Sequence, residues 1–248
     1  MNIPEPDRNL LKANLWDAWD RLETDQKKGL LYPPIHKPVS EDTVLIDLVP
    51  VGEFNIGGIS LFEAIQRRRS WRSFTNQPLS LEELSFLLWA TQGVHAIIQG
   101  GAATRRTVPS AGARYPFETY LLVHRVTGLE VGVYRYQAIE HKLAHVYNHP
   151  ELPEKSNSAC SSFAGQAAVV FVWTVIPYRT EWRYGALSPK LIAQDVGHVC
   201  ENLYLAVEAI GAGTCAVNAY VQDEMDELLR VDRLDEFTIC CAPVGKVG

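Results

Sequence analysis

The stretch 66-QRRRSWRSF-74 places four arginines within six residues. The chain of 248 residues carries 23 Lys and Arg against 29 Asp and Glu, which gives a formal net charge of −6. A nucleic-acid-binding protein would present a broad basic surface, not one local cluster in an acidic chain. The arginines therefore indicate a small anionic partner.

The arginine cluster has two interpretations. Ser60 and Glu63 form a capping-box pattern, so three of the arginines would lie in the last turn of a helix over 60–69, where cations complement the helix dipole and otherwise face solvent. Ser70 and Arg72, however, extend the cluster past the expected helix end. A hydroxyl beside forked guanidinium groups suits a tetrahedral oxyanion, so we favour a phosphate-bearing ligand.

Nucleotide-binding loops of the usual kinds are absent from the sequence. No GxGxxG motif follows an expected strand, and no GxxxxGK[ST] motif occurs in the chain. These motifs mark dinucleotide-binding folds and P-loop proteins, respectively. The sequence therefore argues against ATP and against a Rossmann-type NAD site.

Periodicity and capping signals on both sides of the cluster predict the secondary structure. Helices are expected over 8–28, 60–69, 81–93, 188–211 and 222–230, and strands over 118–126, 131–136, 142–147, 167–175, 213–220 and 237–245. Ser188 is the expected N-cap of the longest helix. Because helices and strands interleave without regular βαβ alternation, we predict an α+β fold with a mixed sheet.

The N-terminal part of the chain differs from the rest. The expected helix over 8–28 is followed by residues 29–58, which are rich in Pro and Gly and have no sustained period. We therefore predict an N-terminal helix and extended arm over 1–58 and one main domain over 59–248.

Membrane and disulfide signals are also missing. No apolar run approaches the roughly 20 residues that a membrane span needs, and the N-terminus lacks a signal-peptide pattern. The five cysteines are an odd number without CxxC spacing, and Cys240 and Cys241 are adjacent in an apolar run. Buried free thiols in a reducing compartment fit this pattern. We expect a cytoplasmic protein without nucleic-acid or membrane partners.

Two patterns suggest a metal site, and we discount both. His141, His145 and His149 would align on a helix, but their segment alternates like a strand. Asp195 and His198 form a D-x-x-H pair, but a di-iron site needs a second such pair, which the sequence lacks. We predict no metal and a polar helix–helix or dimer contact for the Asp195 pair.

Three segments of the chain form a recognisable combination: 65-IQRRRSWRSFTNQPLSLEELSFLLWATQGV-94, 107-TVPSAGARYPFETYLLV-123 and 197-GHVCENLYLAVEAIGAGTCAVNAY-220. In this order they resemble the FMN-dependent nitroreductase superfamily. The resemblance covers about residues 55–247, and it is closest to the SagB-type subgroup, the azoline-oxidising dehydrogenases of thiazole and oxazole peptide maturation. It implies a nitroreductase-like α+β fold with a mostly antiparallel sheet flanked by helices, and a homodimer with FMN at the interface.

The resemblance also implies which residues bind the cofactor. One group would hold the FMN phosphate and ribityl chain, a second would come from the partner subunit and lie along the isoalloxazine ring, and a third would present backbone donors near flavin N5. The first group is Arg68, Arg69, Ser70 and Arg72 together with Lys246. The second group is Pro109, Ser110, Ala111 and Gly112, and the third is Val217, Asn218 and Ala219.

The expected activity is hydride transfer through flavin N5, between NAD(P)H or an organic donor and an electron-poor acceptor such as a nitroaromatic or quinone. Two alternatives remain open: an azoline-to-azole peptide dehydrogenase, and a non-catalytic flavin-binding module. Azole-forming relatives resemble this chain near Arg183 and Tyr184, but with Lys in place of the arginine. Because a guanidinium stays protonated and cannot serve as a base, we expect inefficient azoline oxidation.

Overall fold

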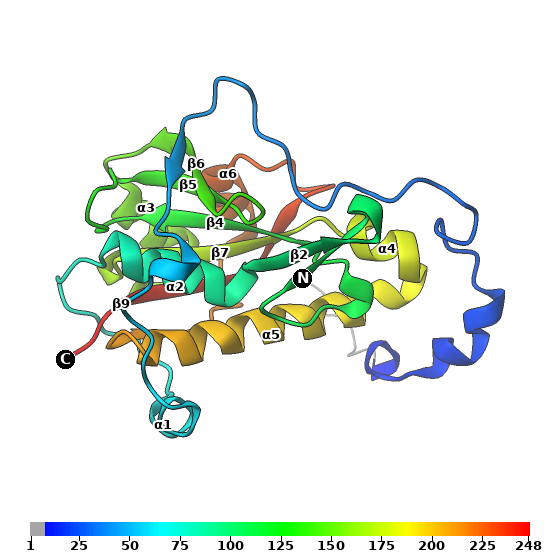
Figure 1. Cartoon of the computed structure of the whole chain (residues 1–248), viewed down its shortest axis with the longest axis horizontal. Helices are drawn as coiled ribbons and strands as arrows, with labels where there is room; N and C mark the ends of the chain where they lie inside the picture. Colours follow the sequence, from blue (N-terminus) through cyan, green and yellow to red (C-terminus); the bar gives the residue numbers. More distant parts are fainter. Residues whose placement is uncertain (1–7) are drawn as a thin grey trace, which may run out of the picture.

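A seven-stranded sheet forms the centre of the computed structural model, which describes residues 8–248 (Figure 1). Its strands lie in the order β1-β6-β5-β4-β7-β9-β8, and every pairing between them is antiparallel. Their bounds are Leu45–Asp47 (β1), Phe117–Val123 (β4), Gly132–Gln137 (β5), Lys142–Asn148 (β6), Val169–Val175 (β7), Ala212–Thr214 (β8) and Phe237–Lys246 (β9). A separate hairpin pairs β2 (Val94–Ile98) with β3 (Ala103–Arg106).

Helices cover both faces of the sheet, as the pattern of buried residues in β7 shows. All seven residues of this strand are buried, and successive side chains point to opposite faces. Phe171 and Trp173 pack in one core cluster with α2 and α5, whereas Val170 and Val172 pack in the other with α3 and α6. These helices span Leu81–Gln92 (α2), Leu152–Ala159 (α3), Ser188–Glu208 (α5) and Gln222–Leu229 (α6). The predicted α+β fold with helices flanking a mostly antiparallel sheet is confirmed.

Local signals located most helix starts correctly. The capping boxes at Ser60 and Ser80 are both formed, and they begin α1 (Leu61–Arg67) and α2. The longest helix starts one residue earlier than expected: Ser188 is its first helical residue, and the N-cap is Leu187, which makes no side-chain cap bond. Two helices had no clear sequence signal, namely α3 and α4 (Tyr178–Tyr184).

The strand predicted over 213–220 is shorter than expected. The ladder of β8 ends at Thr214, and beyond it only Val217 pairs with β9, through an isolated bridge to Cys241. The intervening residues leave the ladder, which turns 215–219 into an irregular segment beside the sheet edge. A β-rich composition predicted a strand here, but the pairing stops where the chain bends toward α6.

The single helix predicted over 8–28 is wrong. The chain forms two 3-10 segments, Arg8–Leu11 and Asn14–Arg21, and Leu22 is already extended. Ala13 supplies no side-chain cap for the second segment. Further on, the amide of Gln26 donates to the carbonyl of Trp182 in α4 at 2.8 Å. Beyond the 3-10 segments a tertiary contact thus takes the place of a continuing helical ladder, since helices draw most of their stability from packing and little from propensity alone.

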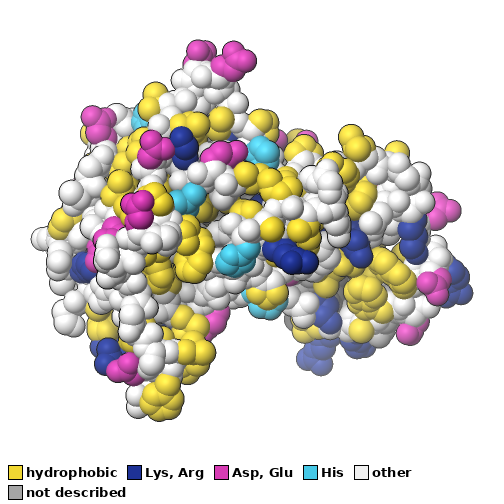
Figure 2. All heavy atoms as spheres, viewed as in Figure 1, with side chains coloured by type: hydrophobic (Ala, Val, Ile, Leu, Met, Phe, Trp, Pro, Cys, Tyr) yellow, Lys and Arg dark blue, Asp and Glu magenta, His cyan; other side chains and the backbone are white. Residues whose placement is uncertain are grey.

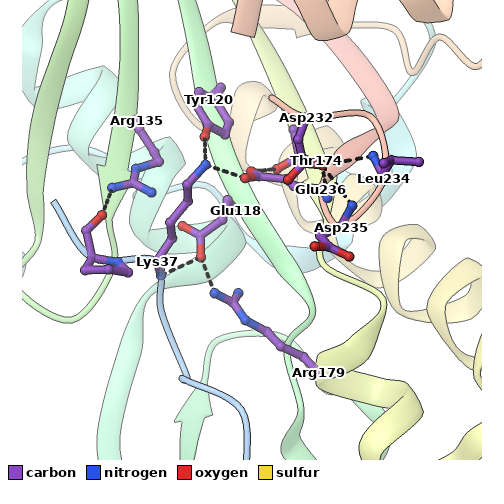
Figure 3. Close-up of polar contacts among 11 residues, drawn as sticks. Lys37, Glu118, Tyr120, Arg135, Thr174, Arg179, Asp232, Leu234, Asp235 and Glu236 are labelled. Atoms are coloured by element: carbon purple, nitrogen blue, oxygen red, sulfur yellow. Dashed lines mark hydrogen bonds and ion pairs between the residues drawn. The ribbon is translucent and has the colours of Figure 1, made fainter. Parts of the chain in front are cut away.

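An extended arm follows and crosses the sheet toward β1 (Figure 1). Lys37 holds it down: its amide donates to Glu118 at 2.9 Å, and its ammonium donates to the Tyr120 hydroxyl at 3.1 Å and pairs with Glu236 (Figure 3). Arg179 donates to the same Glu118 carboxylate at 2.6 Å. Both glutamates are buried, so these bonds compensate charges that would otherwise be costly to bury.

Within residues 8–248, no helix combines the length and the apolar character that crossing a membrane requires.

Candidate functional site

The arginine cluster begins where α1 ends. Arg67 is the last helical residue and pairs with Glu63 at 3.3 Å, one turn earlier. Arg68 leaves the helix with φ −48° and ψ 123°. In the part of the chain that the structure describes, Arg68, Arg69 and Arg72 form no ion pair and no side-chain hydrogen bond. Three cations therefore remain available to an anion, as a phosphate-binding segment requires.

The segment after the cluster is fastened to the sheet edge. The amide of Trp71 donates to the Thr214 carbonyl at 2.9 Å, and the amide of Thr75 donates to the Lys246 carbonyl at 2.8 Å. Gly213 permits this approach, since a Cβ atom there would lie 2.5 Å from the Trp71 ring. The backbone of the cluster is thus held by β8 and β9.

Aromatic rings hold two of the arginines. The Arg69 guanidinium lies 3.7 Å from the centre of the Trp71 ring, and the Arg68 guanidinium lies 5.4 Å from the centre of the Tyr204 ring. The Tyr204 hydroxyl is also 3.0 Å from the Ser70 hydroxyl. Stacking of this kind restrains a guanidinium without neutralising it. Tyr204 was not identified as a site residue from the sequence. Its position beside the apolar stripe of α5 is the one feature of the sequence that could have indicated it.

Lys246 and the segment 217–219 lie close to the cluster but are partly engaged within the chain. The Lys246 ammonium pairs with Glu83 and donates to the Ile210 carbonyl at 2.6 Å, so it points to the C-terminal end of α5. The Val217 amide donates to the Cys241 carbonyl at 2.7 Å. Asn218 and Ala219 are exposed, and they are the members of this segment that face solvent.

The loop containing Pro109, Ser110, Ala111 and Gly112 lies against α5. The Ser110 hydroxyl donates to Asp195 at 2.5 Å, and the Ala111 amide donates to the same carboxylate at 3.1 Å. Burial raises the pKa of Asp195, while these two hydrogen bonds and the nearby His198 lower it less strongly. The D-x-x-H pair thus contributes a loop-fixing carboxylate, a role more specific than the predicted polar contact.

Gly112 brings this loop to Arg183 and Tyr184. Its φ is +59°, and a Cβ atom there would lie 2.7 Å from the Tyr184 hydroxyl and 2.8 Å from the Arg183 side chain. Tyr184 is 9% exposed, and its ring contacts Trp16 and Trp19 at centroid distances of 6.1 and 5.8 Å. The two residues predicted as catalytic therefore lie beside the loop predicted to follow the flavin ring.

Within one chain, the predicted site residues form two groups. The first contains 68–72, 217–219 and Lys246 near the C-terminal end of α5, and the second contains 109–112 with 183–184 near its N-terminal half. Asp195 and Tyr204, which contact the two groups, are nine residues apart on this helix. At 1.5 Å per residue the separation along the axis is about 14 Å.

No group of three or more histidine, cysteine, aspartate or glutamate side chains that could hold a metal ion occurs among residues 8–248. His141 is engaged otherwise: its ring nitrogens lie 2.8 Å from the Tyr136 hydroxyl and 3.0 Å from the Val49 carbonyl.

Known proteins are similar to this chain in sequence and in fold. The chain is 34% identical over 206 residues to a candidate nitroreductase of Methanocaldococcus jannaschii, which covers 83% of this chain and 98% of that protein. It is 28% identical over 138 residues to the trifolitoxin-processing protein TfxB of Rhizobium leguminosarum, which covers 53% of this chain and 37% of that protein. This second relation agrees with the expected likeness to the SagB-type subgroup.

A crystal structure of a candidate nitroreductase from Ralstonia eutropha matches this structure with a TM-score of 0.69 and 25% identity, over 88% of this chain and 99% of that chain. The nitroreductase family model itself matches residues 65–246, which include the arginine cluster, the loop at 109–112 and the whole of α5. The chain therefore belongs to the nitroreductase family of oxidoreductases.

Proposed function

We propose that this protein is an FMN-dependent oxidoreductase that acts as a homodimer. It passes hydride through flavin N5 between NAD(P)H or an organic donor and an electron-poor acceptor such as a nitroaromatic or quinone. One observation carries the proposal: within the described residues, Arg68, Arg69 and Arg72 form no ion pair, and they flank the exposed Ser70 in the sequence. The nitroreductase fold, together with three neighbouring arginines that form no ion pair, fits a flavin that carries a phosphate.

The donor set fits the two ends of FMN. Guanidinium groups and a hydroxyl match a phosphate that carries nearly two negative charges. At the other end, the small residues Ser110, Ala111 and Gly112 allow a flat ring to approach the backbone closely. We propose that Lys246 and the amides of Asn218 and Ala219 complete the site at the sheet edge.

The two groups of site residues support a site shared between subunits. They contact α5 about 14 Å apart in one chain, so we propose that the loop at 109–112 meets the arginine cluster of a second copy. The surface of α1 is consistent with this arrangement. Leu61, Phe62 and Ile65 are 67%, 73% and 59% exposed, and Figure 2 shows hydrophobic side chains at the tip where Figure 1 places α1. A second subunit would cover this apolar face.

Each group of residues then has a separate task. Bound FMN would supply the hydride chemistry, because hydride transfer belongs to the cofactor. The arginines and Ser70 anchor the phosphate, and Gly112 leaves room beside Tyr184. Arg183 lies next to that position and keeps its charge, so it can stabilise negative charge but cannot remove a proton.

We also propose the division of the chain into an arm over 1–58 and an FMN-binding domain over 59–248. All five cysteines are free, which supports a cytoplasmic location. An azoline-to-azole peptide dehydrogenase is the second candidate, favoured by the relation to a trifolitoxin-processing protein. A flavin-binding module without turnover is a third, because phosphate and ring contacts serve both roles.

One experiment separates these candidates. The purified protein is loaded with FMN and mixed anaerobically with NADH or NADPH while the visible flavin absorbance is recorded. Rapid bleaching, followed by recovery on addition of a quinone or nitroaromatic, is the expected result. A protein that neither contains nor takes up FMN would contradict the proposal, and FMN uptake without bleaching by any donor would favour the passive module.

A further inference from the structure

Tyr204 joins two segments of the proposed FMN site through its hydroxyl group. This residue lies on α5, one turn before the helix ends at Glu208. The backbone amide of Ala216 donates to the Tyr204 oxygen at 2.8 Å. The Ser70 hydroxyl lies 3.0 Å from the same oxygen. A side chain that the resemblance did not assign therefore connects the arginine segment to the segment beside β8.

In the second hydrogen bond, between Tyr204 and Ser70, the geometry allows either hydroxyl to donate. A phenol has one proton, and its oxygen already accepts the Ala216 proton. In either direction one of the two hydroxyl protons lacks an acceptor within the described residues. A phenol is more acidic than an aliphatic alcohol and is the stronger hydrogen-bond donor, so we assign Tyr204 as the donor to Ser70. The hydroxyl proton of Ser70 is then the one without an acceptor. That proton is then free to donate to an anion.

The surroundings favour an anion at that position. Ser70 is exposed and stands between Arg69 and Arg72, which have no ion pair among residues 8–248. The Arg68 guanidinium lies 5.4 Å from the centre of the Tyr204 ring. The tyrosine therefore restrains two donors at once, Arg68 through its ring face and Ser70 through its hydroxyl.

We propose that Tyr204 is a positioning residue for the cofactor phosphate. It fixes the Ser70 hydroxyl as a donor, through the series Ala216 amide to Tyr204 hydroxyl to Ser70 hydroxyl to phosphate oxygen. The inference rests on the proposed function, since it assumes that the arginine segment binds FMN.

The test compares two flavins that differ only in the phosphate. FMN and riboflavin are titrated into apoprotein, and the dissociation constant of each is measured for the wild type, Tyr204→Phe and Ser70→Ala. Tyr204→Phe should weaken FMN binding about tenfold and change riboflavin binding by no more than about twofold. A double variant that combines Tyr204→Phe with Ser70→Ala should bind FMN no more weakly than Ser70→Ala alone, because the two hydroxyls act through one contact.

A matched control removes a tyrosine hydroxyl elsewhere. Tyr147 donates to the Leu228 carbonyl at 2.6 Å, in the cluster on the α3 and α6 side of the sheet. Tyr147→Phe should leave the affinity for both flavins unchanged. Replacement of Tyr204 by 3-fluorotyrosine keeps the fold and makes the phenol a stronger donor, so it should tighten FMN binding and leave riboflavin binding unchanged.

Different failures have different meanings. If the wild type binds FMN no better than riboflavin, the proposed phosphate site itself is wrong. If the wild type prefers FMN, but Tyr204→Phe keeps that preference or loses affinity for both flavins equally, the positioning role of Tyr204 is wrong. Additive losses in the double variant would also overturn it.

Discussion

The Ser110 hydroxyl donates to the Asp195 carboxylate at 2.5 Å, and this bond joins two residues that are 85 positions apart in the sequence. The length is typical of a charge-assisted O–H···O bond. Because Asp195 also accepts the Ala111 amide, one buried side chain fixes the loop beside Arg183 and Tyr184. The loop is therefore fastened to α5 in addition to its own internal hydrogen bonds.

We predict that Asp195→Ala destabilises the protein. The change leaves the Ser110 hydroxyl and the Ala111 amide without their acceptor, at a cost on the order of 1–3 kcal/mol. The free energy of unfolding, measured by urea denaturation, checks this. The control is Asp47→Ala, which removes an exposed ion pair with Lys142 and should cost less than about 1 kcal/mol. Equal losses in the two variants would show that Asp195 has no special role.

The stability of this loop should also depend on pH. Burial raises the pKa of Asp195, so the folded protein binds this proton more tightly than the unfolded chain does. The stabilisation from this group is complete below the pKa of an unfolded aspartate, which is about 3.9. It is lost as the pH rises through the pKa that Asp195 has in the folded protein. Asp195→Asn should remove that contribution, visible as a flatter stability profile at acidic pH. An unchanged profile would contradict the assignment.

FMN affinity should depend on the arginines that have no partner. Arg68→Ala or Arg72→Ala should weaken FMN binding by about tenfold to a hundredfold, or 1.5–3 kcal/mol, because phosphate oxygens lose charge-assisted contacts. Arg67 is the matched control, since it already pairs with Glu63 and belongs to the helix. Fluorescence titration of FMN gives both values. If all three variants bind equally well, the cluster is only a solvated helix end.

Glu208 should oppose cofactor binding. Burial raises the pKa of this carboxyl, whereas Arg67, Arg69 and Arg68 lower it less strongly, which places the group in the field of the cluster. Glu208→Gln should therefore strengthen FMN binding about two- to fivefold at neutral pH, as expected for removing one half-screened like charge. Glu201→Gln changes an exposed carboxyl on the same helix and serves as the control. Weaker binding in Glu208→Gln would mean that the carboxylate helps to order the arginines.

The apolar face of α1 should be needed for dimer formation. Phe62→Glu places a charge on a side chain that is 73% exposed in the single chain, so it should leave the monomer fold intact and disrupt the dimer. We expect a monomer in sedimentation experiments and loss of bound FMN, against a wild-type interface above ~2,000 Å². Leu31→Glu, at an 81% exposed position on the arm, is the control. A Phe62→Glu dimer with FMN bound would contradict the shared site.

Azoline oxidation should be inefficient. Aromatising an azoline requires a base beside the hydride acceptor, and Arg183 cannot accept a proton. The FMN-loaded protein is incubated with a thiazoline-containing peptide, and a loss of 2 Da is followed by mass spectrometry. Multiple turnovers would overturn this expectation. Loss of that turnover in Tyr184→Phe would then identify Tyr184 as the proton-transfer residue.

Local patterns predicted the parts of this fold that local interactions determine. The capping box of Ser60 and Glu63 involves residues three apart, and the structure forms it as expected. The central strands were also predictable, because burial on both faces leaves continuous apolar runs such as that of β7.

Contacts between distant residues could not be predicted in the same way. The helix expected over 8–28 is replaced by two 3-10 segments, and after them Gln26 bonds to α4 instead of continuing a helix. Tyr204 reaches Ser70 across 134 positions, and no spacing rule marks such a pair. For the candidate site, the sequence named residues by resemblance, while the roles of Asp195 and Tyr204 required the packing of α5.

The contacts of Lys37 also bear on the order in which the chain can fold. Its partners Glu118, Tyr120 and Glu236 are 81, 83 and 199 positions away. Contacts this remote carry a large loop-closure cost and form after local structure. The arm leaves the ribosome early, yet it can be fastened only once the segment before β9 has been synthesised and brought to the sheet. Until then the part of the sheet that the arm crosses stays uncovered, and a refolding experiment should find the arm protected from proteolysis last.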